Sequence, residues 1–543
     1  MYSQLRIGAL SALFFIALTP DSRGSVLLGR PTDQSITANV LFPQPTDFYL
    51  EYGVQNGVYP LSTPTFSNLS GVPREVTLTG LSPNTRYYYR LRSRLTGATS
   101  FATSPEYTFH TQRAVGSPFT FTIEADEHLY DKKGVASLYE ICLQNQANDH
   151  PDFMLSLGDI FGDDHRPDSI TSGELDTLHR NYRPFLDEVC HSVPFYVCLG
   201  NHEGENDYYL AQNPPNNLAV WGTQWRQYYY PNPEPNSFYS GNTTFEPFGI
   251  GYPENYYAWQ WGNALFVVLD VYRDQCDTSA KPKNWNWTLG QAQYDWLAQT
   301  LDTSTATYKF VFAHHVRGQG RGGVTNARLF EWGGYEQDGI TYTFPAKRPG
   351  WAAPIHQLFI NHGVNIFFQG HDHVFAHEVL DGVTYQAMPM ACDSTYEIGM
   401  LANADAYVSD TLDGSGHLRV TVEPNCVTVD FVRAYLPADT VSGLHHNGEV
   451  AFSYTVGSCL ISSVQERESA MLSVFPNPAD ESVLLRIPDG MQASRFTLSD
   501  LLGKTVLESD YPQLQLSALP AGIYLIRAYT TDSVLQTKLI VRH

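Results

Sequence analysis

The stretch Phe153-Met154-Leu155-Ser156-Leu157-Gly158-Asp159 decides how the centre of this chain folds. Residues 153–157 are almost all apolar and Gly158 ends the run, which indicates a short strand buried in a mixed sheet. Asp159 follows directly, at the position where open α/β sheets place their chemically active groups. A single aspartate there more often only caps a loop. Asp159 becomes a candidate ligand that bridges two metal ions because other ligand-type side chains follow similar strands in the same chain.

The surrounding sequence alternates between strand and helix patterns. Strands are expected at residues 119–123, 194–199, 266–270, 308–313 and 364–368, and helices at residues 133–146, 172–189, 289–301 and 355–362. The first strand, the first helix and the strand at 153–157 form a βαβ unit, so the sheet should have parallel strands here. Residues 203–255 are rich in aromatic residues, Pro and Asn without a clear period, which predicts a long loop.

Five short clusters of potential metal ligands each follow an apolar, strand-like run. They are Asp126-Glu127-His128, Gly158-Asp159, Gly200-Asn201-His202-Glu203, His314-His315 and Gly370-His371-Asp372-His373. Their carboxylate, amide and imidazole groups suit Zn, Mn or Fe, and the lack of a CxxC pair in the sequence argues against thiolate zinc sites. Two ions about 3.5–4 Å apart can activate a bridging water for attack on phosphorus. Such a pair needs one shared carboxylate, which Asp159 can supply.

In their order along the chain, these clusters resemble the calcineurin-like metallophosphoesterase family, whose pattern is D-x-H, G-D, G-N-H-[DE], a His after a strand, and G-H-x-H. The resemblance implies a site for two metal ions. The first ion would be bound by Asp126, His128, Asp159 and His373, and the second by Asp159, Asn201, His314 and His371. It also implies that a metal-bridging hydroxide is the nucleophile. His202 would lie outside both ligand sets and protonate the leaving alkoxide or stabilise its charge.

Residues next to these ligands are expected to support the reaction. Glu203 would orient nearby groups, and His315 and Arg317 are candidate substrate-binding residues, although Arg317 is equally consistent with a solvated loop residue. Two positions depart from related families. Purple acid phosphatases have a Tyr three residues after the bridging Asp, where this chain has Gly162, so no purple enzyme is expected. Asp163 is a candidate partner for His202, one residue away from the Asp that protein phosphatases use.

The N-terminal part reads as a small β-sandwich, because residues 25–113 alternate apolar and polar side chains in short bursts separated by Pro, Gly and Asn. The run Leu81-Ser82-Pro83-Asn84-Thr85-Arg86-Tyr87-Tyr88-Tyr89 resembles the E–F corner of fibronectin type III domains, with Tyr87 as the buried corner tyrosine. A domain of this kind precedes the catalytic domain in purple acid phosphatases. It is expected to act as a spacer or a lid on the substrate side.

The two ends of the chain carry export signals. Arg6, the apolar residues 7–18 and Pro20 are typical of a signal peptide, and the apolar run is too short for a comfortable membrane span. No other segment is long enough to be a transmembrane helix. At the other end, Val474-Phe475-Pro476-Asn477-Pro478, Leu498-Ser499-Asp500-Leu501-Leu502-Gly503-Lys504 and Leu519-Pro520-Ala521-Gly522-Ile523-Tyr524 resemble the type A sorting domain of type IX secretion. The resemblance implies recognition by that machinery and secretion or display at the cell surface.

Composition narrows the functional classes further. The chain has 543 residues and a formal net charge of −23. It contains no basic run, which argues against nucleic-acid binding. Its seven cysteines would allow up to three disulfides in an exported protein, with pairing that the sequence leaves open.

The expected fold is therefore multidomain. We expect a signal peptide at residues 1–24, a fibronectin type III-like β-sandwich at 25–113, a central α/β (αββα) metallophosphoesterase sandwich at 114–462, a linker at 463–470 and a small C-terminal β-sandwich at 471–543. The expected activity is that of a secreted phosphomonoesterase that hydrolyses a phosphate ester with two metal ions. A phosphodiesterase for nucleotide or lipid head-group esters is the alternative, and an inactive surface binding protein is a second one.

Overall fold

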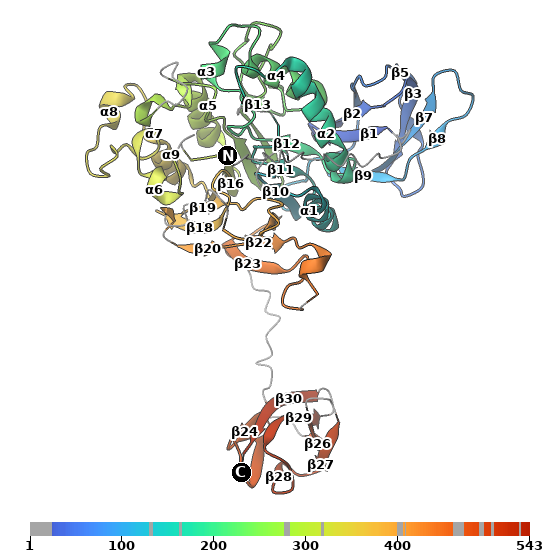
Figure 1. Cartoon of the computed structure of the whole chain (residues 1–543), viewed down its shortest axis with the longest axis vertical. Coiled ribbons are helices and arrows are strands. Elements are labelled where there is room, and N and C mark those ends of the chain that lie inside the picture. The colour runs from blue at the N-terminus through green and yellow to red at the C-terminus, as the bar shows by residue number, and fades with distance from the viewer. Residues whose placement is uncertain are drawn as a thin grey trace, which may run out of the picture. The chain divides into compact units, whose positions relative to one another are not determined.

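The computed structural model of the protein describes most of the chain. The described residues are 24–129, 134–161, 166–275, 283–316, 320–398, 406–407, 409–441, 443–459, 472–487, 493–500, 504–530 and 534–542. They form two compact units, Met1–Ser458 and Cys459–His543, which are described separately below (Figure 1). The expected signal peptide, apart from Gly24, and the expected linker at 463–470 lie outside the described residues.

The N-terminal part of the first unit is a β-sandwich, as predicted. One sheet contains β1 (Ser25–Gly29), β2 (Ser35–Leu41) and β6 (Arg74–Thr79), and the other is built around β3 (Thr46–Gly53) and β7 (Arg86–Leu95). Tyr87 is buried, stacks on Phe109 with ring centroids 5.3 Å apart, and accepts a hydrogen bond from the Ser82 N–H at 2.8 Å. A tyrosine hydroxyl bonded to backbone a few residues upstream is the arrangement of a tyrosine corner.

The central part consists of two sheets packed face to face. The six-stranded sheet has the order β12-β11-β10-β21-β22-β23 and the eight-stranded sheet the order β13-β14-β15-β16-β17-β19-β18-β20. The strands of the first are β10 (Phe119–Glu124), β11 (Met154–Ser156), β12 (Phe195–Val197), β21 (Gly416–Val422), β22 (Cys426–Arg433) and β23 (Val450–Gly457). Those of the second are β13 (Ser240–Gly241), β14 (Tyr257–Trp261), β15 (Ala264–Val268), β16 (Tyr308–Phe312), β17 (Ile366–Gln369), β18 (Phe375–Leu380), β19 (Val383–Ala387) and β20 (Asp410–Leu412).

An aromatic core joins the two sheets. Phe121 of the first sheet contacts Phe266 and Phe310 of the second, with ring centroids 5.1 and 5.8 Å apart. Such pairs combine a large buried apolar area with favourable ring geometry. The core therefore fixes the two sheets against each other, and with them the loops at their ends.

Helices cover the outer faces of both sheets and complete the predicted αββα sandwich. Helices α1 (Ala136–Asn148) and α2 (Ser172–Cys190) pack on the first sheet, and α5 (Gly290–Thr303) and α9 (Ile355–His362) pack on the second. Figure 1 shows these two pairs of helices on opposite sides of the central domain. The four helices and the strands expected from the sequence are present, with ends that shift by a few residues.

The prediction of a structureless segment between residues 203 and 255 is wrong in its middle. Helix α4 (Leu218–Tyr229) lies there, and the Asn217 side chain caps it by accepting a hydrogen bond from the Val220 N–H at 2.9 Å. The helix escaped sequence analysis because its buried face includes Thr223 and Arg226, which interrupt the apolar period that identifies a helix.

The N-terminal sandwich and the central domain share a buried polar contact. Arg183 of α2 is almost fully buried, and its guanidinium donates to the side-chain and backbone oxygens of Asn39 at 2.8 and 2.6 Å. It also donates to the Tyr229 carbonyl at 3.0 Å. A buried cation is stable only when its donors are satisfied, so this contact fixes the sandwich against the helices.

The second unit is a small β-sandwich, as predicted. One of its sheets has the order β24-β25-β28 and the other the order β27-β26-β29-β30. The strands are β24 (Ser473–Phe475), β25 (Ser482–Arg486), β26 (Ala493–Ser499), β27 (Thr505–Ser509), β28 (Gln513–Gln515), β29 (Gly522–Thr530) and β30 (Val534–Val541). Its own core includes Leu498, Ile526 and Leu539.

Two further expectations concern membrane spans and cysteines. None of the helices in the described parts of the chain is long and apolar enough to cross a bilayer. Cys426 and Cys459 each take part in a disulfide, whereas Cys142, Cys190, Cys198 and Cys392 are free and buried. Cys276 lies outside the described residues.

Candidate metal centre

The candidate ligands lie in loops at the carboxyl ends of five strands. β10, β11 and β12 run parallel in the first sheet, and β16 and β17 run parallel in the second. Because the carboxyl ends of parallel strands meet at one edge of a sheet, the loops that follow them converge. The seven predicted metal ligands all come from these loops: Asp126 and His128 after β10, Asp159 after β11, Asn201 after β12, His314 after β16, and His371 and His373 after β17.

Three residues form the first half of the site. The Nε2 atoms of His128 and His373 are 3.1 Å apart. The Oδ1 atom of Asp126 lies 3.5 Å from Nε2 of His373 and 4.0 Å from Nε2 of His128. All three side chains are buried, and their spacing is that of a metal-binding group.

The second half contains Asp159, His314 and His371. Nε2 of His314 lies 3.1 Å from Oδ2 of Asp159 and 3.2 Å from Nδ1 of His371. The other ring nitrogen of His314, Nδ1, donates to the Leu157 carbonyl at 2.7 Å. This second hydrogen bond fixes the ring so that Nε2 faces the other ligand atoms.

Asp159 connects the two halves. Its Oδ2 atom is 3.1 Å from Nε2 of His314 on one side and 3.8 Å from Nε2 of His128 on the other. Its Oδ1 atom accepts a hydrogen bond from the His202 N–H at 2.8 Å. A single carboxylate thus reaches both groups, as expected of a ligand that two ions share.

The donor set fits hard or borderline metal ions. Oδ1 of Asp126 and Oδ1 of Asn201 are buried and have no hydrogen-bond partner within the described part of the chain. Burying an oxygen without a partner is unfavourable, and a cation beside it removes that cost. Paired imidazole nitrogens and carboxylate oxygens at this spacing suit Zn, Mn or Fe, so the residues fit the metal pair that the sequence predicts.

The charges of the site favour ionised carboxylates. Burial raises the pKa of Asp159, but the charges of His314 and His202 outweigh this and hold it well below its usual range. For His314, burial lowers the pKa, and the charge of Asp159 and its hydrogen bond raise it to about 9. Burial also raises the pKa of Asp126, but the charges of His373 and His314 outweigh it and lower that pKa, so both aspartates present negative oxygens to a cation.

The backbone around the ligands adopts a conformation that most residues avoid. The φ angles are +56° at Asp126, +44° at His128, +62° at Asp159, +67° at His371 and +56° at His373. Positive φ is uncommon for residues with a side chain and clusters at functional sites, because surrounding structure must hold it. Five of the seven candidate ligands share this feature.

Glu203 holds the loop that carries Asp159. One of its carboxylate oxygens accepts hydrogen bonds from the N–H groups of Ile160 and Phe161 at 2.7 and 2.8 Å, and the other accepts from those of Asp159 and Gly200 at 2.9 and 2.5 Å. Glu203 is buried, and its pKa is raised to about 7, first by burial and then by the charge of Asp159. The expected orienting role of Glu203 has this physical basis, since four backbone donors converge on it.

We expect Glu203→Gln to weaken metal binding about 10- to 100-fold, the usual cost of losing a group that supports a ligand. The amide would turn an N–H toward backbone N–H donors and release the Asp159 loop. Competition with a chelator measures the affinity. Glu331→Gln is the matched control, because Glu331 is also buried and accepts a backbone hydrogen bond from Leu289 at 2.8 Å, but it lies outside these loops. Equal affinity in both variants would contradict this role.

Asp372 is a supporting residue that sequence analysis missed. It is fully buried between His371 and His373 and accepts hydrogen bonds from the Gly322 N–H at 2.6 Å and from the Tyr407 hydroxyl. Nη1 of Arg321 lies 3.1 Å from its Oδ1. The only sequence signal was its place in Gly-His-Asp-His, because all its partners come from distant segments.

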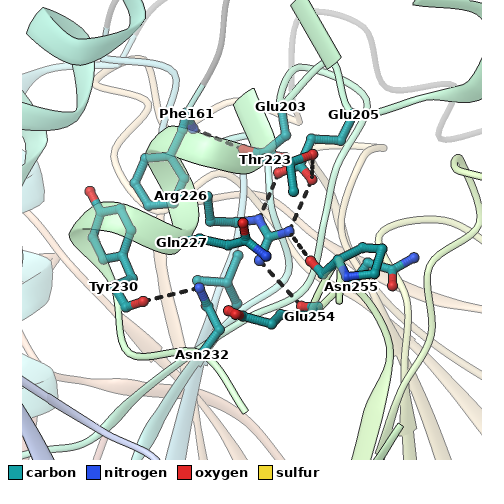
Figure 2. A network of polar contacts seen from close by, with 12 residues as sticks. Phe161, Glu203, Glu205, Thr223, Arg226, Gln227, Tyr230, Asn232, Glu254 and Asn255 are labelled. Atoms are coloured by element: carbon teal, nitrogen blue, oxygen red, sulfur yellow. Dashed lines mark hydrogen bonds and ion pairs between the residues drawn. The ribbon is translucent and has the colours of Figure 1, made fainter. Parts of the chain in front are cut away.

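A second buried network connects the loop that carries Asn201 and His202 with helix α4. The carboxylate of Glu205 accepts hydrogen bonds from Nε and Nη2 of Arg226 in α4 at 2.6 and 2.9 Å and from the Thr223 hydroxyl at 2.7 Å. Figure 2 shows Arg226 between Glu205 and the carbonyl groups around Glu254. Arg273, shortly after β15, lies 3.4 Å from the same carboxylate.

The remaining predicted residues take different positions. His202 is 8% exposed, and its ring lies edge-on to that of His128 with centroids 5.0 Å apart. His315 is fully buried, with its ring 4.9 Å from that of His371. Arg317, Gly162 and Asp163 lie outside the described residues.

Comparison with protein families identifies two domains. Residues 119–375 match the family described as calcineurin-like phosphoesterase, and residues 473–542 match the secretion system C-terminal sorting domain. The chain therefore contains a calcineurin-like metallophosphoesterase domain and a type IX sorting domain. The sorting domain marks the protein for secretion or for display at the cell surface.

Solved structures share the fold. A purple acid phosphatase, PPD1, from yellow lupin (Lupinus luteus) seeds is 17% identical, with a TM-score of 0.53 over 80% of this chain and 74% of that one. The structure of PhoD is also 17% identical, with a TM-score of 0.55 over 80% of this chain and 90% of that one. At this identity the likeness concerns the fold. No curated protein matches the sequence significantly.

Proposed function

We propose that this chain, with its calcineurin-like phosphoesterase domain, is an exported hydrolase of phosphoric esters and acts first of all on phosphomonoesters. The observation that carries the proposal is the position of Asp159, whose Oδ2 atom lies within 3.9 Å of ring nitrogens from His128, His202 and His314. A shared carboxylate flanked by two sets of histidines can hold two metal ions close enough together for in-line phosphoryl displacement.

Each residue of the site has a separate task in this proposal. Asp126, His128, Asp159 and His373 would hold one ion, and Asp159, Asn201, His314 and His371 the other. When bound, such ions lower the pKa of water and stabilise charge on phosphate oxygens. Glu203 and Asp372 fix the ligand loops by accepting backbone hydrogen bonds. Nε2 of His202, 3.9 Å from Asp159 and more exposed than the buried ligands, would deliver a proton to the leaving oxygen.

Two esters test the class of substrate. The purified protein, loaded with Zn, Mn or Fe, is offered p-nitrophenyl phosphate and bis-p-nitrophenyl phosphate. We expect turnover of the monoester to exceed that of the diester. Turnover of the diester alone would make the protein a phosphodiesterase, and turnover of neither by protein that retains its metals would favour a binding role.

We expect His202→Ala to lower turnover about 100- to 10,000-fold, the usual contribution of a general acid, and to leave metal content intact. The loss should be larger for an alkyl phosphate such as glycerol phosphate than for p-nitrophenyl phosphate, because p-nitrophenolate leaves without a proton. Initial rates on both esters and metal analysis measure this.

His356→Ala is the matched control for that comparison. His356 is a buried histidine of α9 that bonds to Tyr385 at 2.7 Å, away from the metal ligands, so its removal should not change the ratio of the two rates. Loss of bound metal in His202→Ala would contradict its assignment as a proton donor outside the ligand sets.

A further inference from the structure

One side of the candidate metal centre is more open than the rest. Asp126, His128 and His314 are fully buried, whereas Asn201 and His371 are partly exposed and His202 is 8% exposed. A phosphate ester can reach the centre only past side chains that contact solvent. Asn201, His202 and His371 are therefore the candidate site residues that a substrate can contact first.

Arg321 lies next to His371, one of these partly exposed candidate ligands. Its Nη1 atom donates hydrogen bonds to the His371 carbonyl and to Oδ1 of Asp372, the latter at 3.1 Å, and its side chain is 22% exposed. Among the residues that the structure describes, none accepts a hydrogen bond from Nε or Nη2 of Arg321. The guanidinium thus keeps donors available beside a candidate metal ligand.

The position of Arg321 is fixed by its surroundings. The Gly322 N–H donates to Oδ2 of Asp372 at 2.6 Å, and the Asn326 side chain donates to the Arg321 carbonyl at 2.5 Å. A cation held in this way can bind an anion without first losing much conformational freedom.

We propose that Arg321 binds a non-bridging oxygen of the substrate phosphate and makes the site selective for dianionic monoesters over monoanionic diesters. This inference rests on the proposed function and names the residue that sets its substrate class. The planar fork of a guanidinium matches two phosphate oxygens, and its hydrogen bonds to charged oxygens are strong. A fixed cation stabilises a doubly charged group more than a singly charged one.

The test compares Arg321→Ala, Arg321→Lys and Tyr407→Phe. Tyr407 is the matched control, because its hydroxyl also donates to Asp372 but carries no charge. Both Arg321→Ala and Tyr407→Phe weaken the anchor of the His371 loop, and only the first removes the cation. The measurements are KM and kcat for p-nitrophenyl phosphate and bis-p-nitrophenyl phosphate, the inhibition constant of inorganic phosphate, metal content and melting temperature.

We expect Arg321→Ala to raise KM for the monoester and the inhibition constant of phosphate about 10- to 100-fold. KM for the diester should rise less, Arg321→Lys should restore part of the loss, and Tyr407→Phe should not change the ratio of the two KM values. Equal effects of Arg321→Ala and Tyr407→Phe, or equal increases for both esters, would overturn the inference and leave Arg321 as an anchor of Asp372.

The two proposals fail in different ways. If the metal-loaded wild-type protein hydrolyses neither ester, the proposed function fails, and calorimetric titration with inorganic phosphate still tests Arg321. Binding to the wild-type protein that Arg321→Ala weakens would support a phosphate contact, and equal binding would refute it. If the wild-type protein is active and Arg321→Ala keeps its KM for the monoester, the function stands and the inference about Arg321 is wrong.

Discussion

Replacing Asp159 with Asn should reduce hydrolysis about 1000-fold or more and lower the number of bound metal ions. The amide keeps the size of the side chain but loses the charge that two cations would share, and it can offer only one oxygen. Metal ions in such sites lower the activation barrier by several kcal/mol, and each 1.36 kcal/mol changes the rate tenfold. Initial rates at saturating substrate, together with elemental analysis of the purified protein, measure both effects.

Asp152→Asn is the matched control for this variant. Asp152 lies just before the other end of the same strand, is buried, and accepts two hydrogen bonds from Arg113 at 2.7 Å. Its replacement should lower the melting temperature but leave metal content and turnover of the folded protein unchanged. Asp159→Asn protein that retains two ions and wild-type turnover would show that the carboxylate does not bridge them.

The largest loss of stability is expected for Glu205→Gln, about 3–5 kcal/mol, which is the usual effect of breaking a buried ion pair from one side. Arg226 is 1% exposed and Arg273 is 5% exposed, and both would keep their charge without the carboxylate that they share. Because Glu205 follows Asn201 and His202 closely, the loop that carries these two candidate site residues should loosen as well. Chemical denaturation followed by tryptophan fluorescence measures the loss.

Glu246→Gln provides the comparison for that measurement. Glu246 pairs with the same Arg273, at 2.8 Å, but its side chain is 20% exposed, so water can replace part of the interaction. We expect a loss of about 1 kcal/mol or less for this variant. A loss in Glu205→Gln no larger than in Glu246→Gln would mean that the buried network contributes little to stability.

Much of the central fold follows from local patterns in the sequence. The runs that became β10, β11, β12, β16 and β17 are short and apolar and end at Gly or at a polar ligand, so both the strands and the order of the ligands could be predicted. The meeting of Asp126 and Asp159 also followed, because the carboxyl ends of neighbouring parallel strands lie at one edge of a sheet. His314 follows a strand of the other sheet, so its place beside them was implied only by the family resemblance. The N-terminal sandwich could be predicted from Tyr87 and from the turn residues around it.

The supporting contacts could not be predicted in the same way. Asp372 depends on Gly322 and Tyr407, and Glu205 depends on Arg226 and Arg273, which are distant in the sequence and carry no local signal. The positive φ angles of the candidate ligands could not be predicted from the sequence either. They depend on contacts such as those of Glu203 and not on residue type. Sequence patterns identified the ligands, whereas tertiary structure determines what holds them.

The buried contact of Arg183 with Asn39 bears on how this protein can evolve. The cation comes from helix α2 of the central domain, whereas acceptors on Asn39 and Ser25 come from the β-sandwich and the Tyr229 carbonyl from the central domain, so neither domain satisfies it alone. Recombination that replaced the sandwich with an unrelated module would leave the buried guanidinium of Arg183 without several of its hydrogen-bond acceptors. Gene fusion or domain shuffling should therefore have transmitted the two as a pair, and lineages that lost the sandwich should have replaced Arg183 as well.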